Sequence, residues 1–464
     1  FQEAKDMIKW AFELSEEIRN PVMVRSVTRL SHASGNVTLG ELPAPNGRAY
    51  FKHDGPPMDP MTGVILSYPV ALKHARQQEK LRQAVIRFEQ SPFNTYSGPQ
   101  HPELLMITSS ACFLYSKEAI SLLDVHDRVG LLKLGTTWPL PPELMEKYLA
   151  CSEKILVVEE VISFLEDEVK ILAADLAPRI GIKTFHGKKD GSVPTVGELN
   201  PDRVAAALSK ILDIDYKPVP DRYIQRAGEI VNDAAPGRDL TFCPGCPHRA
   251  SFWSIHTALQ MDNRQGFVCG DIGCYSLAML PSGYRTLKTL HSMGSGIGLA
   301  GGFGKLDMFG MDQPAIAVCG DSTFFHAVLP ALVNAVHQKS NITLIVLDNS
   351  GTAMTGFQPH PGLAVDAAGQ SLAGIEIPGV CEAIGARVTA CDPFDLKRTQ
   401  QTLLELLEDE SGVKVLVLKQ ICALSPEKKA KKRYEMKVDE TVCLGENCGC
   451  NRLCTRVFKC PGLN

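Results

Sequence analysis

The sequence predicts an α/β protein of several domains built on parallel sheets. Its 464 residues correspond to about three domains at the usual ~150 residues each, so every domain is large enough to bury a core. Short apolar runs alternate with helical patterns in two separate regions, one beginning near Leu104 and the other near Cys243. This alternation is typical of parallel strands joined by helices.

The first segment, residues 1–45, begins with an amphipathic helix. Its apolar face comprises Phe1, Ala4, Ile8, Ala11, Leu14 and Ile18. Val22 to Val24, after Pro21, is strand-like. A domain rarely starts directly with such a helix, so we expect the last part of an α/β domain whose earlier part is missing. A processed or engineered terminus is the alternative.

Residues 46–102 mix glycine, proline and polar residues around one charged helical stretch, Val70 to Glu89, and predict a connector. Residues 103–215 predict a small parallel-sheet domain. Its apolar runs are Leu104–Thr108, Gly130–Leu134 and Ile155–Val158, and its helical patterns are Lys117–Leu123, Pro142–Leu149 and Phe164–Ala173.

Residues 216–425 predict the larger α/β domain. Its strand-like runs are Phe267–Val268, Ala315–Cys319, Leu344–Leu347, Ala386–Val388 and Val413–Leu418. Residues 426–464 begin with a polar stretch, Pro426 to Lys437, that carries six basic residues and predicts a solvated linker. The cysteine-rich end of the chain follows it.

Charge and hydropathy exclude two classes of partner. Forty-eight Lys and Arg against fifty-two Asp and Glu give a net charge of −4, so no overall positive field favours nucleic acid. No apolar run approaches the ~18 to 20 residues that span a bilayer, and the N-terminus lacks a signal-peptide pattern. We expect a soluble, cytoplasmic protein.

Most of the fifteen cysteines gather in local clusters, which favours metal or iron–sulfur ligation over disulfides.

An acid and an amide follow two apolar runs that are one strand–helix–strand unit apart. Gly320-Asp321-Ser322 ends the first run and Asp348-Asn349 ends the second. This spacing is a thiamine diphosphate signature, in which Mg²⁺ takes oxygen ligands from the protein and the diphosphate. We expect Asp321, the Asn349 amide oxygen and the Gly351 carbonyl as its protein ligands. Gly320 would admit the diphosphate, and Ser322 would open a phosphate-binding helix. An ordinary strand, turn and helix with a capping aspartate is the alternative.

A competing motif lies upstream. Gly296 to Gly301 matches G-x-G-x-x-G, and Asp321 lies where a dinucleotide fold would place its ribose-binding acid. The preceding segment, Thr289 to Ser295, does not look like a buried strand. Close helix packing, or contact with another cofactor, therefore explains these glycines better than a dinucleotide site.

A second constellation consists of four cysteines in the loops of the larger domain, namely Cys243, Cys246, Cys274 and Cys422. Four thiolates suit either Zn²⁺ or a [4Fe-4S] cluster. Buried small hydrophobes, or a redox dithiol at Cys243 and Cys246, are the alternatives.

The third constellation is the C-terminal set of Cys443, Cys448, Cys450, Cys454 and Cys460, the last followed by Pro461. It resembles a ferredoxin-type [4Fe-4S] segment that uses four of the five cysteines, although the spacing departs from C-x2-C-x2-C. A structural zinc site is the alternative.

His248 follows the Cys243 loop and His291 precedes the glycine run, so either could be an acid or base near neutral pH. A structural histidine is the alternative for each.

Four strings resemble the alpha subunits of indolepyruvate-type 2-oxoacid:ferredoxin oxidoreductases. They are Cys243–Arg249, Gly270–Tyr275, Gly320–His326 and Leu347–Gly356. Weaker strings resemble that family's middle domain, which is related to the C-terminal domain of transketolase; they are Leu134–Thr136, Pro139–Pro141 and Val157–Glu160. The resemblance extends over nearly the whole chain and implies that residues 1–45 are the tail of a pyrimidine-binding domain.

The resemblance also implies a set of cofactor contacts. They are Gly270, Asp271, Met293, Gly294, Gly320, Asp321, Ser322, Asn349, Gly351, Thr352 and Met354. It implies thiamine-dependent oxidative decarboxylation of an aryl-2-oxo acid to an acyl-coenzyme A, with electrons passed through [4Fe-4S] clusters to ferredoxin. A smaller beta subunit would be the partner.

Two departures keep alternatives open. The family's glutamate that activates the aminopyrimidine has no counterpart in this sequence, and only one altered ferredoxin-type motif is present. A non-redox thiamine-dependent 2-oxoacid decarboxylase would need no clusters. A non-catalytic, cluster-bearing electron-transfer subunit would keep a degenerate thiamine site.

Overall fold

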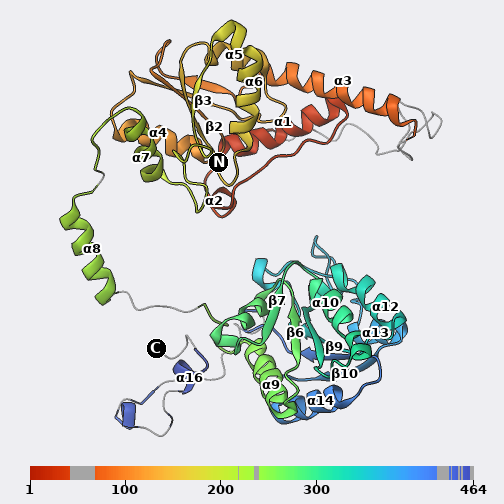
Figure 1. Ribbon diagram of the computed structural model, residues 1–464. Helices are drawn as coiled ribbons and strands as arrows, with labels where there is room; N and C mark the ends of the chain where they lie inside the picture. Colours follow the sequence, from red (N-terminus) through yellow and green to blue (C-terminus); the bar gives the residue numbers. More distant parts are fainter. Residues whose placement is uncertain are drawn as a thin grey trace. The chain divides into compact units, whose positions relative to one another are not determined.

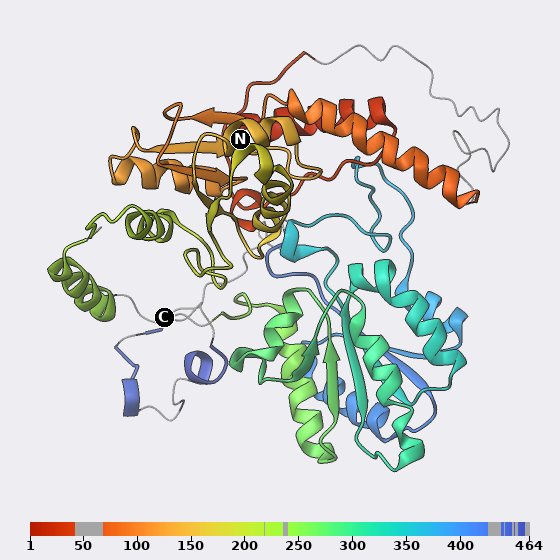
Figure 2. The ribbon, with the colours of Figure 1, turned by 45° about the horizontal axis from the view of Figure 1, so that its top comes forward.

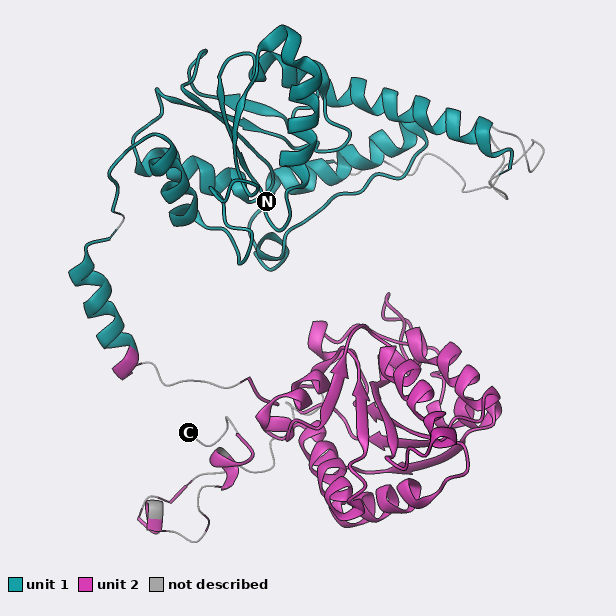
Figure 3. Cartoon of the chain, in the orientation of Figure 1, with its two compact units in different colours: residues 1–231 teal, residues 232–464 magenta. Residues whose placement is uncertain are grey.

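The computed structural model forms two compact units, Phe1–Val231 and Asn232–Asn464 (Figure 3). It describes residues 1–41, 68–217, 219–234, 240–425, 438–439, 441–447, 450 and 453–459. Most of the expected connector, residues 42–67, lies outside the described residues. So do Cys448 and Cys460.

Unit 1 contains a five-stranded sheet in the order β1-β3-β2-β4-β5, parallel except for β1, which runs antiparallel to β3. The strands are β1 (Thr95–Ser97), β2 (Leu104–Thr108), β3 (Val129–Lys133), β4 (Lys154–Val158) and β5 (Thr184–His186). The sheet thus begins at Thr95, inside the stretch that the sequence assigned to the connector. β2 is buried along its whole length, as expected of a parallel strand covered on both faces.

The helices of unit 1 cover both faces of this sheet (Figure 1). They are α1 (Gln2–Ile18), α2 (Thr28–Ser31), α3 (Val70–Glu89), α4 (Cys112–Leu122), α5 (Pro142–Leu149), α6 (Phe164–Ile180) and α7 (Pro201–Ile211). Alternate residues of β2 enter opposite cores: Leu104 and Met106 pack with α4 and α7, whereas Leu105 and Ile107 pack with α5 and α6. α1 packs on α3 through a small separate core.

The strand expected at Val22 to Val24 is wrong. These residues have no sheet partner, and Met23 is 91% exposed. α1 ends at Arg19 in the left-handed conformation, and Val22 then packs against the α1–α3 core. An apolar run becomes a strand only where a sheet edge accepts it, so β-propensity alone does not decide the outcome.

Unit 2 contains a six-stranded, fully parallel sheet in the order β10-β11-β9-β8-β6-β7. The strands are β6 (Phe267–Gly270), β7 (Leu287–Leu290), β8 (Ala315–Gly320), β9 (Ile342–Asp348), β10 (Arg387–Cys391) and β11 (Val413–Lys419). β8 and β9 are buried throughout. The expected α/β fold class with parallel sheets is confirmed.

Helices on both faces complete unit 2 (Figures 1 and 2). They are α9 (Pro247–Asp262), α10 (Ser295–Phe303), α11 (Asp321–Thr323), α12 (Leu329–His337), α13 (Ile377–Ile384) and α14 (Leu396–Glu408), with a short α16 (Leu453–Arg456) near the C-terminus. α9 and α14 pack on one face, and α10, α12 and α13 pack on the other. The boundary between the two units falls within α8 (Asp221–Ala234), which buries none of its residues. Among the described helices, none has the length and apolar character needed to cross a bilayer.

Candidate functional site

The candidate site lies where β8 and β9 end. These strands are neighbours, and Gly320 pairs with Leu347. Asp321 and Asn349 therefore follow at the same edge of the sheet, and both are buried. The carboxyl edge of a parallel sheet is where α/β folds bind ligands.

The Asn349 side-chain amide reaches both Asp321 and Gly351. One of its terminal atoms lies 3.2 Å from Asp321 Oδ2 and 2.8 Å from the Gly351 carbonyl oxygen, and the amide nitrogen at that position donates to both. A half-turn of the amide places its oxygen there instead, beside two other oxygens. Octahedral Mg²⁺ at about 2.0–2.1 Å from each ligand holds neighbouring oxygens about 2.9 Å apart. In that second orientation Asp321, Asn349 and the Gly351 carbonyl, named here the oxygen set, have donor types and a spacing that fit a magnesium ion.

Backbone N–H groups hold the Asp321 carboxylate in place. Ser322 N donates to Oδ1 at 2.7 Å, and Gly351 N donates to Oδ2 at 3.1 Å. A helical stretch begins at Asp321 and passes through a π-helical turn, Phe324–Val328, before α12. π-Turns inside helices are frequent at functional sites.

His360 belongs to this site, although the sequence gave no reason to select it. Its Nε2 lies 3.3 Å from Asp321 Oδ2, and among the described residues it has no aligned hydrogen-bond partner. Its Nδ1 accepts from Gly362 N at 3.2 Å, which leaves the proton on Nε2, facing the carboxylate. The ring stacks on Phe325. A buried N–H directed at a metal-ligating carboxylate is a common outer-shell arrangement.

Asp348 adds a second buried carboxyl. Burial, followed by the charge of Asp321, raises the pKa of Asp348, and Lys419 Nζ at 3.3 Å partly offsets this. The edge therefore concentrates negative charge, which favours a cation.

Asp271 and Gly294 come together beside the site. Asp271 accepts a short hydrogen bond from Tyr275 Oη and a bond from Gly294 N at 3.0 Å. Burial raises the pKa of Asp271 to about 6, although these two hydrogen bonds oppose the shift. Gly294 has φ +81°, and a Cβ there would lie 2.6 Å from that of Ala327, so only glycine fits this turn.

The structure gives Gly320 a packing role next to Tyr275. A Cβ at this position would lie 2.9 Å from the Tyr275 ring, whereas φ is −88° and needs no glycine. Tyr275 also approaches Thr323, with 3.3 Å between their hydroxyl oxygens. Gly320 thus makes room for the side chain that follows Cys274.

The four cysteines of the larger domain come within electrostatic reach of one another. Burial, together with the charges of Cys243, Cys422 and Cys274, raises the pKa of the Cys246 thiol to about 12, although the His248 backbone N–H opposes this shift. All four are free thiols. Four neighbouring thiols suit either a metal ion or an iron–sulfur cluster, whose positive charge would favour the thiolate form.

The cysteine set touches the oxygen set. Cys422 N donates to the Asn349 backbone oxygen at 3.1 Å. Asn349 therefore connects the two sets through its side chain and its backbone. Within the described ranges, no three His, Cys, Asp or Glu side chains form a preformed metal site.

The C-terminal cysteines are only partly described. Cys443, Cys450 and Cys454 are exposed, and among the described residues none of them joins a preformed metal site.

The remaining predicted residues differ in their surroundings. His248 is buried within electrostatic reach of Asp321, and burial lowers its pKa to about 4. His291 is exposed, as are Met293 and Met354, while Thr352 is partly buried after Gly351. The structure thus brings His248 to the site edge and leaves His291 in solvent.

The glycine run near α10 serves helix packing. The strand that precedes it, β7, is fully buried only at its first residue, as expected of a segment that is not a buried strand, and β6 lies between β7 and β8. Asp321 is therefore not on the neighbouring strand, as a dinucleotide fold requires. A Cβ on Gly296 would lie 2.8 Å from the Cys269 carbonyl oxygen, so this glycine lets α10 approach β6.

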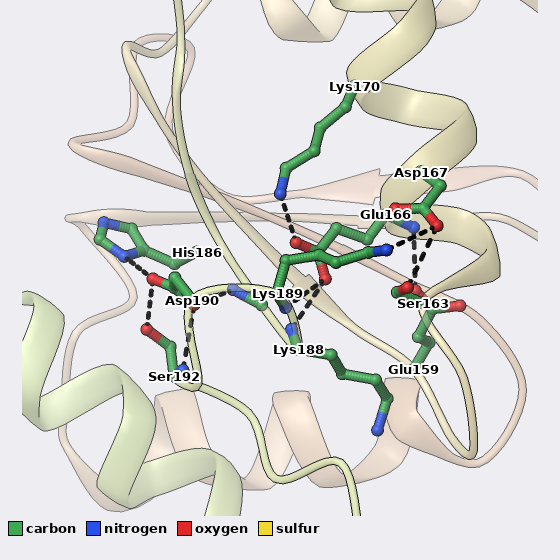
Figure 4. A network of polar contacts seen from close by, with 11 residues as sticks. Glu159, Ser163, Glu166, Asp167, Lys170, His186, Lys188, Lys189, Asp190 and Ser192 are labelled. Atoms are coloured by element: carbon green, nitrogen blue, oxygen red, sulfur yellow. Dashed lines mark hydrogen bonds and ion pairs between the residues drawn. The ribbon is translucent and has the colours of Figure 1, made fainter.

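The carboxyl edge of the unit 1 sheet is different (Figure 4). Glu159, after β4, accepts from Leu165 N and Glu166 N and so caps α6. Glu166 accepts from Lys188 N at 2.7 Å and Lys170 Nζ at 2.5 Å. These buried carboxylates are satisfied by the chain itself.

Asp190 completes that network. It accepts from Gly187 N, Ser192 and His186. Burial alone would raise the pKa of Asp190, but the hydrogen bonds outweigh it and hold the pKa below its usual value.

Comparisons with known proteins also point to unit 2 as the cofactor-binding part of the chain. Residues 271–417 match the family of thiamine pyrophosphate enzymes, C-terminal TPP binding domain. The chain is similar to proteins named indolepyruvate oxidoreductase subunit IorA. That of Thermococcus kodakarensis is 37% identical over 99% of this chain and 71% of its own length, and that of Archaeoglobus fulgidus is 33% identical over 100% and 70%.

A solved structure, 2-oxoglutarate:ferredoxin oxidoreductase from Magnetococcus marinus, is also similar. It has a TM-score of 0.34 and 17% identity over 41% of this chain and 67% of that one. A likeness at that level supports no argument about function.

Proposed function

Because the chain belongs to the indolepyruvate oxidoreductase subunit IorA family, a family of thiamine-dependent oxidoreductases, we propose a specific reaction for it. A 2-oxo acid with an aryl side chain, such as indolepyruvate, reacts with coenzyme A. The products are an acyl-coenzyme A and CO₂, and two electrons leave singly through [4Fe-4S] clusters to ferredoxin. A smaller beta subunit is the partner.

Family membership confirms two expectations from the sequence, an oxidoreductase and a thiamine diphosphate site. We further propose that residues 103–215 are the transketolase C-terminal-like domain, residues 216–425 the diphosphate-binding domain and residues 426–464 the linker and iron–sulfur segment. The matched range, residues 271–417, falls inside the second of these.

One observation carries the proposal: the Asn349 side chain belongs to the oxygen set, while its backbone holds Cys422. A non-redox decarboxylase needs the oxygen set alone. A cysteine set attached to the same residue favours electron removal next to the cofactor.

Some residues of the site would bind the metal ion, and others position the surrounding backbone. We assign Mg²⁺ to Asp321, Asn349 and the Gly351 carbonyl, because their oxygens have the spacing of neighbouring octahedral ligands. When bound, thiamine diphosphate supplies the electron sink for decarboxylation. Asp271 fixes the Gly294 turn through its hydrogen bond. His248 is the candidate acid or base that lies near Asp321, and His291, exposed in this structure, is the weaker candidate.

Further cofactor contacts follow from the same edge of the sheet. We assign them to Gly270, Met293, Gly320, Ser322, Thr352 and Met354. Cys243, Cys246, Cys274 and Cys422 would hold one [4Fe-4S] cluster, and four of the five C-terminal cysteines would hold another.

The test is an anaerobic absorption spectrum of the complex with its partner subunit. Addition of indolepyruvate, thiamine diphosphate and coenzyme A should bleach the visible absorption of the clusters. Iron content, with Cys246→Ser compared against Cys151→Ser, checks the cysteine assignment, because Cys151 lies in unit 1, outside both sets. Thiamine binding without bleaching, or iron content equal in the two variants, would contradict the proposal.

A further inference from the structure

Arg249 lies directly after the Cys243 loop, in the first turn of α9. Its Nε donates to the Cys243 carbonyl at 3.2 Å, and its Nη2 donates to the Phe242 carbonyl. Nη2 also donates to Thr241 Oγ1 at 2.9 Å. One edge of the guanidinium is thus fixed to the backbone of the cysteine loop.

The same guanidinium binds the C-terminal segment, 209 and 210 residues further along the chain. Nη1 donates to the Phe458 carbonyl, and Nη2 donates to the Lys459 carbonyl at 3.4 Å. Thr241 Oγ1 reinforces this contact with a 3.0 Å bond to the Lys459 carbonyl. Because a guanidinium is planar and permanently charged, it holds both backbones in fixed relative positions.

Aromatic rings around Phe458 form a socket for the same segment. The Phe458 ring lies edge-on to Trp253, with 5.4 Å between ring centroids, and to Tyr284, at 6.3 Å. His256 stacks on Tyr284 at 5.0 Å and extends the same cluster. Edge-to-face pairs at these distances are attractive beyond the area they bury.

The docked segment is continuous with a C-terminal cysteine. Phe458 N donates to the Leu453 carbonyl at 3.1 Å, which closes the helical turn that contains Cys454. A constraint on Phe458 therefore also constrains the position of Cys454.

We propose that Arg249 and the Phe458 socket form a dock that holds the C-terminal cysteine segment against the Cys243 loop. The two cysteine sets thereby become neighbours within one chain. The redox consequence of this inference rests on the proposed function. If both cysteine sets held clusters, the dock would position the two for one-electron transfer between them, in which no bond forms or breaks. Arg249 is a positioning residue in this arrangement.

The dock itself can be tested without any cluster. Trypsin cleavage after Lys459 requires access to the carbonyl that Arg249 and Thr241 bind, and the fragment that ends at Lys459 reports it by mass spectrometry. In the full complex, Arg249→Ala should speed this cleavage about tenfold or more, because bonds from a charged donor are lost and cleavage follows the open population. Arg264→Ala, which removes an arginine bound to the Leu407 carbonyl instead, should leave the rate unchanged.

Phe458→Ala provides a second variant that cannot disturb the sheet, because its ring packs from the C-terminal segment. It should also speed cleavage, whereas Phe309→Ala, at an 80% exposed position, should not. Cleavage unchanged in both Arg249→Ala and Phe458→Ala would overturn the dock.

The redox consequence has a separate readout. In the reduced, anaerobically purified complex, magnetic interaction between the clusters should broaden the EPR spectrum, and Phe458→Ala should remove that broadening at unchanged iron content. Broadening that persists after the dock is lost would overturn the placement of the clusters. Absence of iron from the unaltered complex would instead contradict the proposed function, and the trypsin comparison would still decide the dock.

Discussion

The two sheets of this chain share a parallel architecture, but their carboxyl edges differ. In unit 1, the buried carboxylates Glu159 and Glu166 each accept hydrogen bonds from backbone N–H groups of the same unit. In unit 2, Asp321 also accepts hydrogen bonds from backbone N–H groups, those of Ser322 and Gly351, but its Oδ2 additionally lies 3.2 Å from the Asn349 amide and 3.3 Å from His360 Nε2. The first edge is closed by hydrogen bonds within the unit, whereas the second brings together groups that could hold a cation.

This difference separates a structural carboxylate from a functional one. Burial and sequence position are alike at the two edges, since Glu159 and Asp321 each follow a buried parallel strand. What differs is the group beside each carboxylate: the buried Nε2 of His360, next to Asp321, has no aligned hydrogen-bond partner among the described residues. Such an unpaired buried polar atom is costly unless a further interaction is supplied.

The largest expected effect follows from removing the carboxylate of the unit 2 edge. Asp321→Asn should weaken thiamine diphosphate binding in the presence of Mg²⁺ by at least about 100-fold, more than the loss of an outer-shell partner. Calorimetric titration of the complex measures it. Glu166→Gln is the matched control, because it alters a buried carboxylate at the other edge. Equal losses in the two variants would erase the distinction between the edges.

Glu166→Gln should act on stability instead. It leaves the N–H groups of Lys188 and Lys189 with a weaker acceptor and removes the charge paired with Lys170. The expected cost is about 2 kcal/mol of unfolding free energy, measured by urea denaturation of unit 1. Glu118→Gln, at an exposed site of the same unit, should cost almost nothing. A Glu166→Gln variant of unchanged stability would show that the network does not hold the edge together.

His360→Gln should have a smaller effect on the metal than Asp321→Asn. Its Nε2–H faces Asp321 without belonging to the oxygen set, so Mg²⁺ affinity should fall about tenfold, as for outer-shell partners. Titration of Mg²⁺ at saturating thiamine diphosphate reads this out. The same change at His337, an exposed position, is the control. Unchanged Mg²⁺ affinity in His360→Gln would remove this residue from the site.

The smallest effect concerns the amino edge of the unit 2 sheet. There Lys414 lines a cavity of about 380 Å³ and donates to Asn341 Oδ1 and the Asp409 carbonyl. Burial lowers its pKa from 10.5 to about 8, an effect that the Asp409 charge partly offsets. Between these values the unfolded chain holds the proton and the folded chain does not, so stability should rise with pH from about 8 to about 10.5.

Lys414→Met should flatten this rise, as measured by denaturation across that pH range, while Lys339→Met, an exposed lysine, should preserve it. If stability still rises over this pH range in Lys414→Met, the group that loses its proton on folding is not Lys414.

Much of the candidate site can be predicted from the sequence, because the ends of buried strands can be recognised in it. Asp321 and Asn349 each follow a run of buried apolar residues, and parallel register then requires their strand ends to meet. The expected fold class rests on the same runs.

Other features depend on contacts that no local pattern marks. His360 reaches Asp321 from a loop with no periodic pattern, and Arg249 bonds to residues more than 200 positions away. β7 was missed because only its first residue is fully buried. Val22 to Val24 has strand propensity without a free sheet edge beside it.

The most direct test of the central claim replaces Mg²⁺ with Mn²⁺ and follows its EPR signal in the complex with thiamine diphosphate. The account predicts that Mn²⁺ binds in a thiamine-dependent manner, that Asp321→Asn abolishes this binding and that Glu166→Gln preserves it. Binding of Mn²⁺ that is equally strong in Asp321→Asn would contradict the assignment of the oxygen set as the metal site.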